Sequence, residues 1–347
     1  TALRLFEILS ASGIEAYAVG GFVRDSLMGL PVHDIDFAVS ASPEETKRLL
    51  SPFAKMIDTG LKFGTVTAVF EGVPFELTTF RADCGIKDGR HPQSVSFVRD
   101  IVSDLSRRDF TVNAMAWSPE KGLVDPFGGR EDITKRLIRC VGEPSLRFEE
   151  DALRILRSLR FMSRLGFRLD DETAKALRQN VFRLKTISRE RIFSELSGII
   201  CGKNACDTVT EYADVISVAL PELFAGGAFM LKRLPDGLHL RFAALFKNAD
   251  DAENGMFSLK SPRKLRERVV ALRRLIPLPD DEKEILILGI DTPPEILREA
   301  AYWNSTGKTA DIIDRLRMQN AFVSSKNLGI PTQKIMEISH EKGARLG

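Results

Sequence analysis

Residues 16–25 have the sequence AYAVGGFVRD, in which a short apolar run ends in two glycines and a helical pattern follows. Two glycines between a strand and a helix let backbone N–H groups approach a phosphate, and the helix N-terminus favours negative charge. Arg24 falls on the first helical turn, from where it can reach the same anion. A plain tight turn is the simpler explanation of Gly20 and Gly21 taken alone, so the motif depends on its surroundings.

Short runs rich in β-branched and aromatic residues surround this stretch and predict a mixed α/β head over the first part of the chain. Glu71-Gly72 separates two of these runs and indicates a hairpin turn. We expect helices after Gly21 and around residues 108–117. The predicted strands are 16–19, 35–39, 65–70, 75–80 and 94–98.

Beyond Val141 the sequence pattern changes to helices, predicted at 149–165, 171–180 and 188–200 and in several later segments. Two local charge clusters lie in this helical part. Residues 147–191 contain 12 Lys and Arg against 7 Asp and Glu, and residues 260–274 contain 7 against 1. A solvated charged face explains any one cluster, but two of them favour a polyanionic partner.

Asp34 and Asp36 flank Ile35 on a predicted strand. Because residues i and i+2 of a strand point to the same face, the two carboxylates converge, and a divalent cation would relieve their repulsion. Glu76, on a second predicted strand that could lie beside the first, offers a third carboxylate. Two solvent-facing aspartates are the ordinary explanation of an isolated D-x-D sequence, but the glycine turn upstream favours a metal site.

The segment SRRDFTVNA at residues 106–114 combines two arginines with an aspartate and an asparagine. Arginine can hold a triphosphate through paired hydrogen bonds, which makes Arg108 a candidate ligand. Asp109 or Asn113 could bind ribose hydroxyls. A surface helix that begins with Asp109 as its cap explains the same residues equally well.

Residues 149–164, EEDALRILRSLRFMSR, have the pattern of an amphipathic helix. Its polar face carries arginines at positions 154, 157, 160 and 164, whereas an ordinary surface helix mixes lysine with glutamate. Asp151 and Arg154 lie one turn apart and place acceptors beside donors. This combination is suited to recognising the edge of a base by hydrogen bonding.

The composition limits the class of protein. The chain has 347 residues, with 50 Lys and Arg against 48 Asp and Glu, so a uniformly basic coat is excluded. No apolar run approaches the ~18–20 residues of a membrane span, and no signal peptide is apparent. The four cysteines are too scattered for a disulfide framework or a structural zinc site. We therefore expect reduced thiols and a cytoplasmic protein.

In their order and spacing, these motifs resemble the class II tRNA nucleotidyltransferases, the CCA-adding enzyme family, which share a polymerase-beta-like head with bacterial poly(A) polymerases. The matching sequences are GGxxRD at 20–25, DxD at 34–36, RRDxxxNA at 107–114 and EDxxR at 150–154. ELTTFR at 76–81 and ERIFSEL at 190–196 add to the likeness. The resemblance covers the chain from about residue 15 to about residue 225.

The resemblance implies an α/β polymerase-beta-like nucleotidyltransferase head followed by an elongated all-α neck, body and tail. We place the head at 1–140, the neck with its base-recognising helix at 141–200, the body at 201–290 and a tail, which could be truncated, at 291–347. Asp34 and Asp36 would bind Mg²⁺, with Glu76 as the third catalytic carboxylate. The candidate nucleotide-binding residues are Gly20, Gly21, Arg24, Arg108, Asp109, Asn113, Asp151, Arg154, Arg157 and Arg160.

The implied reaction is attack of the 3′ hydroxyl of a tRNA on the α-phosphate of CTP or ATP, with release of pyrophosphate and without a template strand. The implied partners are the tRNA 3′ end and acceptor arm together with CTP and ATP. Neither a membrane nor a protein partner is implied.

Three alternatives remain open on the sequence. An A-adding specialist of the same family fits the same motifs, because a full-length loop expected at residues 81–92 favours a CCA-adding or A-adding enzyme over a CC-adding one; poly(A) polymerases differ in this loop. A poly(A) polymerase ranks lower, since no basic C-terminal extension is visible. A tRNA-binding protein with an inactive head is disfavoured because Asp34, Asp36 and Glu76 are all present.

Overall fold

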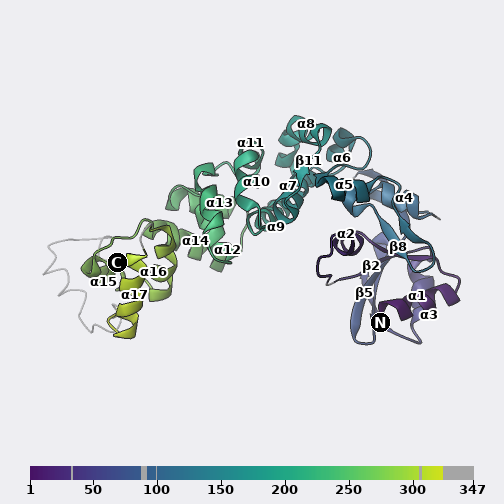
Figure 1. Cartoon of the computed structure of the whole chain (residues 1–347), viewed down its shortest axis with the longest axis horizontal. Helices are drawn as coiled ribbons and strands as arrows, with labels where there is room; N and C mark the ends of the chain where they lie inside the picture. The colour runs from purple at the N-terminus through teal and green to yellow at the C-terminus, as the bar shows by residue number, and fades with distance from the viewer. Residues whose placement is uncertain (33, 87–91, 99, 305–306, 323–347) are drawn as a thin grey trace. The chain divides into compact units, whose positions relative to one another are not determined.

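The structure is a computed structural model that describes residues 1–32, 34–86, 92–98, 100–304 and 307–322. The chain divides into two units, Thr1–Ala219 and Leu220–Gly347 (Figure 1). All the described strands belong to the first unit, and the described part of the second is helical. The predicted fold class, a mixed α/β head followed by helices, is confirmed.

The central sheet of the first unit has seven strands in the order β3-β4-β5-β2-β1-β8-β9. Neighbours are antiparallel except β2 and β5, which are parallel. The strands are β1 Ala16–Val19, β2 Asp36–Val39, β3 Lys55–Gly60, β4 Thr65–Phe70, β5 Val73–Thr79, β8 Ala116–Ser118 and β9 Gly122–Val124. Two small separate sheets pair β6 Arg81–Ile86 with β7 Pro92–Phe97, and β10 Leu137–Ile138 with β11 Arg168–Leu169.

Helices make up most of the rest of the first unit (Figure 1). Those of the head are α1 Ala2–Ala11, α2 Gly21–Leu27, α3 Pro43–Leu50, α4 Ile101–Ser106 and α5 Gly129–Lys135. Those that follow are α6 Pro144–Glu150, α7 Leu153–Leu165, α8 Asp171–Asn180, α9 Arg189–Ile200, α10 Ala205–Glu211 and α11 Ala213–Ala219.

Alternating side chains of the inner strands build a hydrophobic core on each face of the sheet. Ala18 and Phe37 join one cluster with residues of α1 and α3. Tyr17 and Ala38, their neighbours along the strands, join a second cluster with residues of α4. A strand that is covered on both faces reads as a continuous apolar run, which is why residues 16–19 were recognisable from sequence.

The hairpin predicted at Glu71-Gly72 is confirmed. Both residues have positive φ, 50° and 80°, the conformation of a two-residue turn between antiparallel strands. Phe70 pairs with Val73 directly across the turn. The strands β3, β8, β9, β10 and β11 were not predicted, and residues 81–86 form a strand where a loop was expected. The remainder of that predicted loop, 87–91, lies outside the described residues.

One predicted helix was wrong, and a second is interrupted. Around residues 108–117 the chain forms only a 3₁₀ turn, Thr111–Asn113, before it enters β8, so Asp109 is no helix cap. The continuous helix expected at 149–165 is interrupted between α6 and α7. Asp151 has φ −149° and accepts a hydrogen bond from the Leu153 N–H at 3.0 Å. An aspartate side chain that bonds the backbone in this way competes with helical hydrogen bonding.

The second unit consists of helices around α14, which packs against α12, α13 and α16. Their bounds are α12 Leu238–Ala244, α13 Ala249–Ser258, α14 Arg263–Leu275, α15 Glu282–Leu288, α16 Pro294–Ala300 and α17 Lys308–Met318. Val269, Val270 and Leu272 form the buried side of α14. Among the described residues of the chain, no helix has the length and apolarity to cross a membrane.

Candidate active site

Strand register brings the glycine turn and the carboxylates to one place. Val19 pairs with Asp36 across antiparallel β1 and β2, so the chain leaves β1 at Gly20 beside the start of β2. Asp36 is also the register partner of Glu76 across parallel β2 and β5. Because paired residues project on the same face of a sheet, Asp36 and Glu76 share a face. The prediction that their strands are neighbours is confirmed.

Asp34 lies two residues before β2, which begins at Asp36, so the two aspartates do not share a strand. The charge of Asp34 still affects the pKa of Asp36. Burial of the carboxylate by surrounding atoms raises the pKa of Asp36, Arg108 opposes this rise, and Asp34 adds to it. Asp36 itself lies at an exposed rim, so the pKa shift reflects crowding of its carboxylate and not complete enclosure. A second carboxylate close to a partly desolvated one is an arrangement that favours a cation.

The carboxylates suit a metal ion that takes most of its ligands from water and substrate phosphates. Among the described residues, no three His, Cys, Asp or Glu side chains are grouped to hold a metal by themselves. A small divalent ion in a nucleotide site needs only one or two protein carboxylates, because water and substrate phosphates complete its shell. Asp36 meets this requirement with Glu76 beside it and Asp34 nearby.

A cavity of about 620 Å³ adjoins these carboxylates and collects almost all of the predicted site residues. Of the predicted site residues, only Asp34 and Glu76 do not line this cavity. Glu76 lines a smaller cavity of about 140 Å³, and Asp36 and Arg108 line both. The cavity wall contains nine arginines and three aspartates, a large positive excess suited to a polyphosphate. Its lining is Gly20, Gly21, Arg24, Asp36, Arg81, Arg107, Arg108, Asp109, Asn113, Asp151, Leu153, Arg154, Arg157, Arg160, Phe161, Arg164 and Arg191.

Gly20 allows Arg108 to approach the start of α2. It has φ +67°, and a Cβ added there would lie 3.2 Å from a terminal nitrogen of Arg108. Both the backbone conformation and the close approach therefore favour glycine at this position. On the other side of Arg108, Asp104 Oδ2 accepts a hydrogen bond from its Nη2 at 3.1 Å.

Asp104 is a buried carboxylate that holds two arginines of the cavity wall. Its Oδ1 accepts hydrogen bonds from Nε and Nη2 of Arg107 at 3.1 and 2.8 Å, while Oδ2 binds Arg108. The Asp104 residue is fully buried. Burial opposes its ionisation, but the charges and hydrogen bonds of Arg107 and Arg108 outweigh this effect and lower the pKa of Asp104.

A second buried carboxylate, Asp109, binds Arg157 of α7. Its Oδ2 accepts hydrogen bonds from Nε and Nη2 of Arg157 at 2.9 and 2.6 Å. Oδ1 accepts from the Phe110 N–H and from Nδ2 of Asn113. Burial acts against ionisation, and Arg157 outweighs it, so the pKa of Asp109 is lowered. Asp109 thus faces protein donors on both oxygens where ribose hydroxyls were expected.

Arg24 is almost completely buried, with 4% exposure, and contacts Asn113, the residue that donates to Asp109. Its guanidinium donates to Oδ1 of Asn113 and to Oδ1 of Asp25, the latter at 2.8 Å. Arg24, like Arg157 and Arg160, lies over the ring of Phe161. Cations favour the face of an aromatic ring, so Phe161 offsets part of the repulsion among these three arginines.

Asp151 and Arg154, the pair expected to recognise the base, both have protein partners. Asp151 Oδ2 accepts a hydrogen bond from Nη2 of Arg191 at 2.6 Å. Arg154 Nη1 is 2.5 Å from Oε2 of Glu150, and its Nη2 donates to the Arg107 carbonyl at 3.3 Å. A base that binds these two side chains would replace some of these contacts.

Sequence analysis missed Asp104, Phe161 and Arg191 as individual site residues. Asp104 lies three and four positions before Arg107 and Arg108, a spacing that allows ion pairs on a helix, so this signal was available. Arg191 belongs to the ERIFSEL segment, which contributed only to the family resemblance. No pattern within α7 distinguishes Phe161 from an ordinary core residue.

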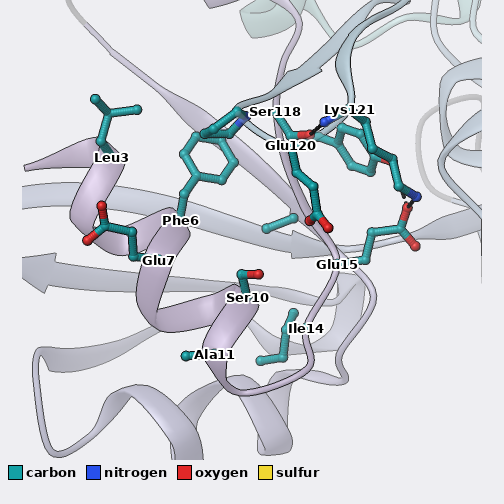
Figure 2. A pocket seen from close by; sticks show the side chains of 13 residues that line it. Leu3, Phe6, Glu7, Ser10, Ala11, Ile14, Glu15, Ser118, Glu120 and Lys121 are labelled. Atoms are coloured by element: carbon teal, nitrogen blue, oxygen red, sulfur yellow. Dashed lines mark hydrogen bonds and ion pairs between the residues drawn. The ribbon is translucent and has the colours of Figure 1, made fainter.

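A larger cavity, about 730 Å³, lies elsewhere in the head and shares no lining residue with the arginine-lined one. Figure 2 shows it beside α1, with Phe6 and Ile14 among its lining residues. Its one hydrogen-bonded charge cluster joins Glu15 to Lys121 and to the Tyr17 hydroxyl at 2.5 and 2.6 Å. These groups satisfy one another, and none of the predicted site residues lines this cavity.

Comparisons with known proteins agree with this geometry. Residues 16–139 match the family model of the poly A polymerase head domain, and residues 166–215 match that of a probable RNA and SrmB-binding site of polymerase A. A CCA-adding enzyme of Geobacillus sp. (strain WCH70) is 37% identical over 352 residues, which cover 97% of this chain and 86% of that enzyme. The chain belongs to the CCA-adding enzyme family.

Other members of the family show how far the likeness extends. A CCA-adding enzyme of Geobacillus thermodenitrificans is 46% identical over 230 residues, which cover 66% of this chain but only 56% of that enzyme. The solved structure of the Bacillus stearothermophilus CCA-adding enzyme in complex with CTP has a TM-score of 0.78 at 31% identity, covering 99% of this chain and 89% of that one. A Thermotoga maritima CCA-adding enzyme complexed with tRNA, at 23% identity and a TM-score of 0.69, shares the fold and covers 100% of this chain and 88% of that one. Nucleotidyltransferases of this family generally use divalent metal ions.

We predict that Asp104→Asn lowers the free energy of unfolding by about 3 kcal/mol at neutral pH, because it leaves Arg107 and Arg108 without their buried counter-charge. The folded pKa of Asp104 is below its ordinary value of 3.8. Its contribution is therefore complete above that pH and is lost as the pH falls through the folded value. The gap between wild type and variant should accordingly narrow in acid.

Urea unfolding followed by the fluorescence of Trp117, with Trp303 replaced by Phe, measures this gap at pH 7 and below pH 3.8. Asp58→Asn is the control, because Asp58 is an exposed aspartate of the same unit that pairs with Lys47. We expect that change to alter stability by less than about 1 kcal/mol. An equal effect of the two variants would contradict the role given to Asp104.

Proposed function

We propose that this chain adds C and A nucleotides to the 3′ end of tRNA, using CTP and ATP and no template strand. The observation that carries the proposal is the cavity in which Asp36, the register partner of Glu76, opens onto nine arginines. This is an acidic metal edge beside a polycationic wall, as nucleotidyl transfer from a triphosphate requires. Membership of the CCA-adding enzyme family supports it.

The triphosphate would bind where positive charge and backbone N–H groups meet. Arg24 and Arg108 lie beside the Gly20-Gly21 turn at the start of α2. Arg108 is partly exposed, with its side chain 20% accessible, whereas Arg24 is buried. We therefore assign direct phosphate contacts to Arg108, and to Arg24 a deeper position behind the glycine turn.

Mg²⁺ is the proposed metal, held by Asp34 and Asp36 with Glu76 as the third carboxylate. When bound, the ion supplies a lower pKa for the attacking hydroxyl and charge stabilisation at the leaving oxygen. The chain's own contribution is to orient the 3′ hydroxyl and the α-phosphate for in-line attack, since positioning supplies most of the rate in phosphoryl and nucleotidyl transfer.

Base selection is proposed for Asp151 and Arg154, with Arg157 and Arg160 completing the pocket. Asp151 and Arg154 lie at the start of α7, and both line the cavity. Their carboxylate and guanidinium offer acceptors and donors that a cytosine or adenine edge can pair with. Asp109 and Asn113 then act mainly through Arg157 and Arg24, to which they are hydrogen-bonded.

The RNA partner is proposed to be the 3′ end and acceptor arm of tRNA. The positive excess of residues 147–191 lies in the same unit as the cavity, and phosphate contacts dominate recognition of folded RNA. A division into head, neck, body and tail at residues 140, 200 and 290 and a cytoplasmic location belong to this proposal. Scattered cysteines and the tRNA substrate support that location.

We predict that the wild-type chain, with Mg²⁺, CTP and ATP, completes tRNA transcripts that lack CCA, CA or only the final A. A gel assay with each nucleotide alone and with both together measures this. Extension of the last transcript only, with ATP, would replace the proposal with an A-adding activity. Long adenosine tails on unrelated RNA would replace it with poly(A) synthesis, and tRNA binding without addition would indicate an inactive head.

In the same assay, Asp36→Ala is expected to lower nucleotide addition by about a thousandfold, because it removes the central carboxylate of the metal edge. Affinity for tRNA in a filter-binding assay should stay within about twofold, since the basic residues that contact phosphates are unchanged in this variant. Asp58→Ala, at an exposed position of the same sheet, is the matched control. Full activity of Asp36→Ala would overturn the metal-site assignment.

For Arg154→Ala we predict that discrimination of CTP and ATP against GTP and UTP falls by at least about tenfold, because a hydrogen-bonding partner of the base is lost. The control is Arg178→Ala on α8, whose guanidinium pairs with Asp214 and is not part of the cavity. Misincorporation kinetics with single nucleotides measure the discrimination. Unchanged selectivity in Arg154→Ala would remove this residue from base recognition.

A further inference from the structure

Arg160 differs from most arginines of the cavity in how it is held. Arg24, Arg108, Arg154, Arg157 and Arg191 each donate a hydrogen bond to a protein acceptor. Arg160 makes no hydrogen bond to any residue that the structure describes. Its Nε lies 2.9 Å from Oε2 of Glu195, but the arrangement leaves both atoms without a proper hydrogen bond. The terminal N–H donors of Arg160 therefore remain available to a ligand, whereas Nε is buried against Glu195.

This arginine is nevertheless confined. The ring of Phe161 lies 5.2 Å from its guanidinium carbon, and the Glu195 carboxylate, on the facing helix α9, supplies the opposite charge. Its side chain is only 32% exposed. An arginine with free donors and a fixed position is suited to bind substrate, because little conformational freedom remains to be lost on binding.

The third contact of Arg160 is with a glycine. Gly198 lies inside α9, where glycine is unfavourable compared with alanine, so its presence needs a packing reason. A Cβ built on Gly198 would lie 2.5 Å from Cδ and 3.0 Å from Cγ of Arg160. Glu195 is three residues earlier, on the same face of α9. One turn of α9 thus presents both the carboxylate for the guanidinium and an empty position for its stem.

We infer that Gly198 is a positioning residue for Arg160: the missing side chain on α9 lets the arginine lie against the helix and point its guanidinium at the nucleotide cavity. The inference rests on the proposed function, in which Arg160 helps to bind CTP and ATP. Any side chain at position 198 would displace Arg160. The atoms in the way are side-chain methylenes of Arg160 and not backbone, so the change acts on the position of the arginine.

The test compares Gly198→Ala, Arg160→Ala and the double variant with the wild-type chain. Equilibrium binding of CTP and of ATP in the presence of Mg²⁺ is measured by calorimetry, and thermal unfolding by circular dichroism. Gly198→Ala should raise the Kd of both nucleotides about tenfold, the effect of one lost charge-assisted hydrogen bond. Its unfolding temperature should stay the same or rise, because alanine favours a helix.

The double variant separates positioning from a general structural effect. In the Arg160→Ala background the Gly198→Ala change has nothing left to displace, so the double variant should bind nucleotides as Arg160→Ala does. Ser194→Ala, an exposed change on the same helix, is the control and should leave Kd unchanged.

Three results would overturn the inference: an unchanged Kd in Gly198→Ala, losses that multiply in the double variant, or an equal loss in Ser194→Ala. A wild-type chain that binds CTP and ATP but adds neither to tRNA would overturn the proposed function alone, because the binding measurements still decide the role of Gly198. A wild-type chain that binds neither nucleotide would overturn both.

Discussion

Mutual repulsion of arginines is the constraint on which the site depends. Nine guanidinium groups line one cavity of about 620 Å³, and like charges in a partly desolvated space repel strongly. Buried carboxylates make this arrangement possible. Asp104 holds Arg107 and Arg108 from the head, and Asp109 holds Arg157 from the helical part. Without these counter-charges the cavity wall could not keep its shape.

The contacts of Asp104 and Asp109 with arginines affect both the stability of the fold and the geometry of the site. Burial acts against the ionised forms of Asp104 and Asp109, yet their arginine partners lower the pKa of both. These carboxylates therefore remain charged at neutral pH and fix the direction of each guanidinium before a substrate arrives. A site prepared in this way has little reorganisation left to undergo during the reaction, which is the main electrostatic advantage of an enzyme over water.

The acidic edge follows a different principle. Asp36 is positioned by backbone pairing, with Val19 on one side and Glu76 on the other. In the part of the chain that the structure describes, no arginine hydrogen-bonds to it, and burial with Asp34 nearby raises its pKa. The protein thus keeps two kinds of carboxylate in one cavity. Those hydrogen-bonded to arginine hold the arginines of the wall, and Asp36, which has no such partner among the described residues, is the one proposed to hold a cation.

Much of the fold could be predicted because the decisive patterns are local. Residues 16–19 and 65–70 form strands with the predicted bounds, the Glu71-Gly72 turn has the expected positive φ values, and helix 171–180 was predicted to the residue. The errors are at positions where tertiary contacts override such patterns. Asp151 interrupts the predicted helix at 149–165, since its side chain caps the backbone and pairs with distant Arg191.

Counting charges along the sequence has the same limit, because tertiary contacts also decide which charges are paired. The basic stretch at 260–274 has a large excess of positive charge along the chain. In the folded unit Arg266 faces Glu253 of α13 and Arg268 faces Glu299 of α16. Neighbouring helices therefore offset part of an excess that sequence counting assigns entirely to a partner.

The sequence by itself determined the chemical groups: the two aspartates, the glycine turn, the arginine-rich helix and their order along the chain, which together indicated the family. Only the tertiary structure decided which groups are engaged with the protein and which are open to a ligand. Asp109 binds Arg157, whereas Arg160 pairs with Glu195 through Nε, has no hydrogen bond from its terminal nitrogens to a described residue, and lies against Gly198. The reason is that these contacts join residues from about 40 to 50 positions apart, and the spacing of residues within one helix or strand carries no information about such pairings.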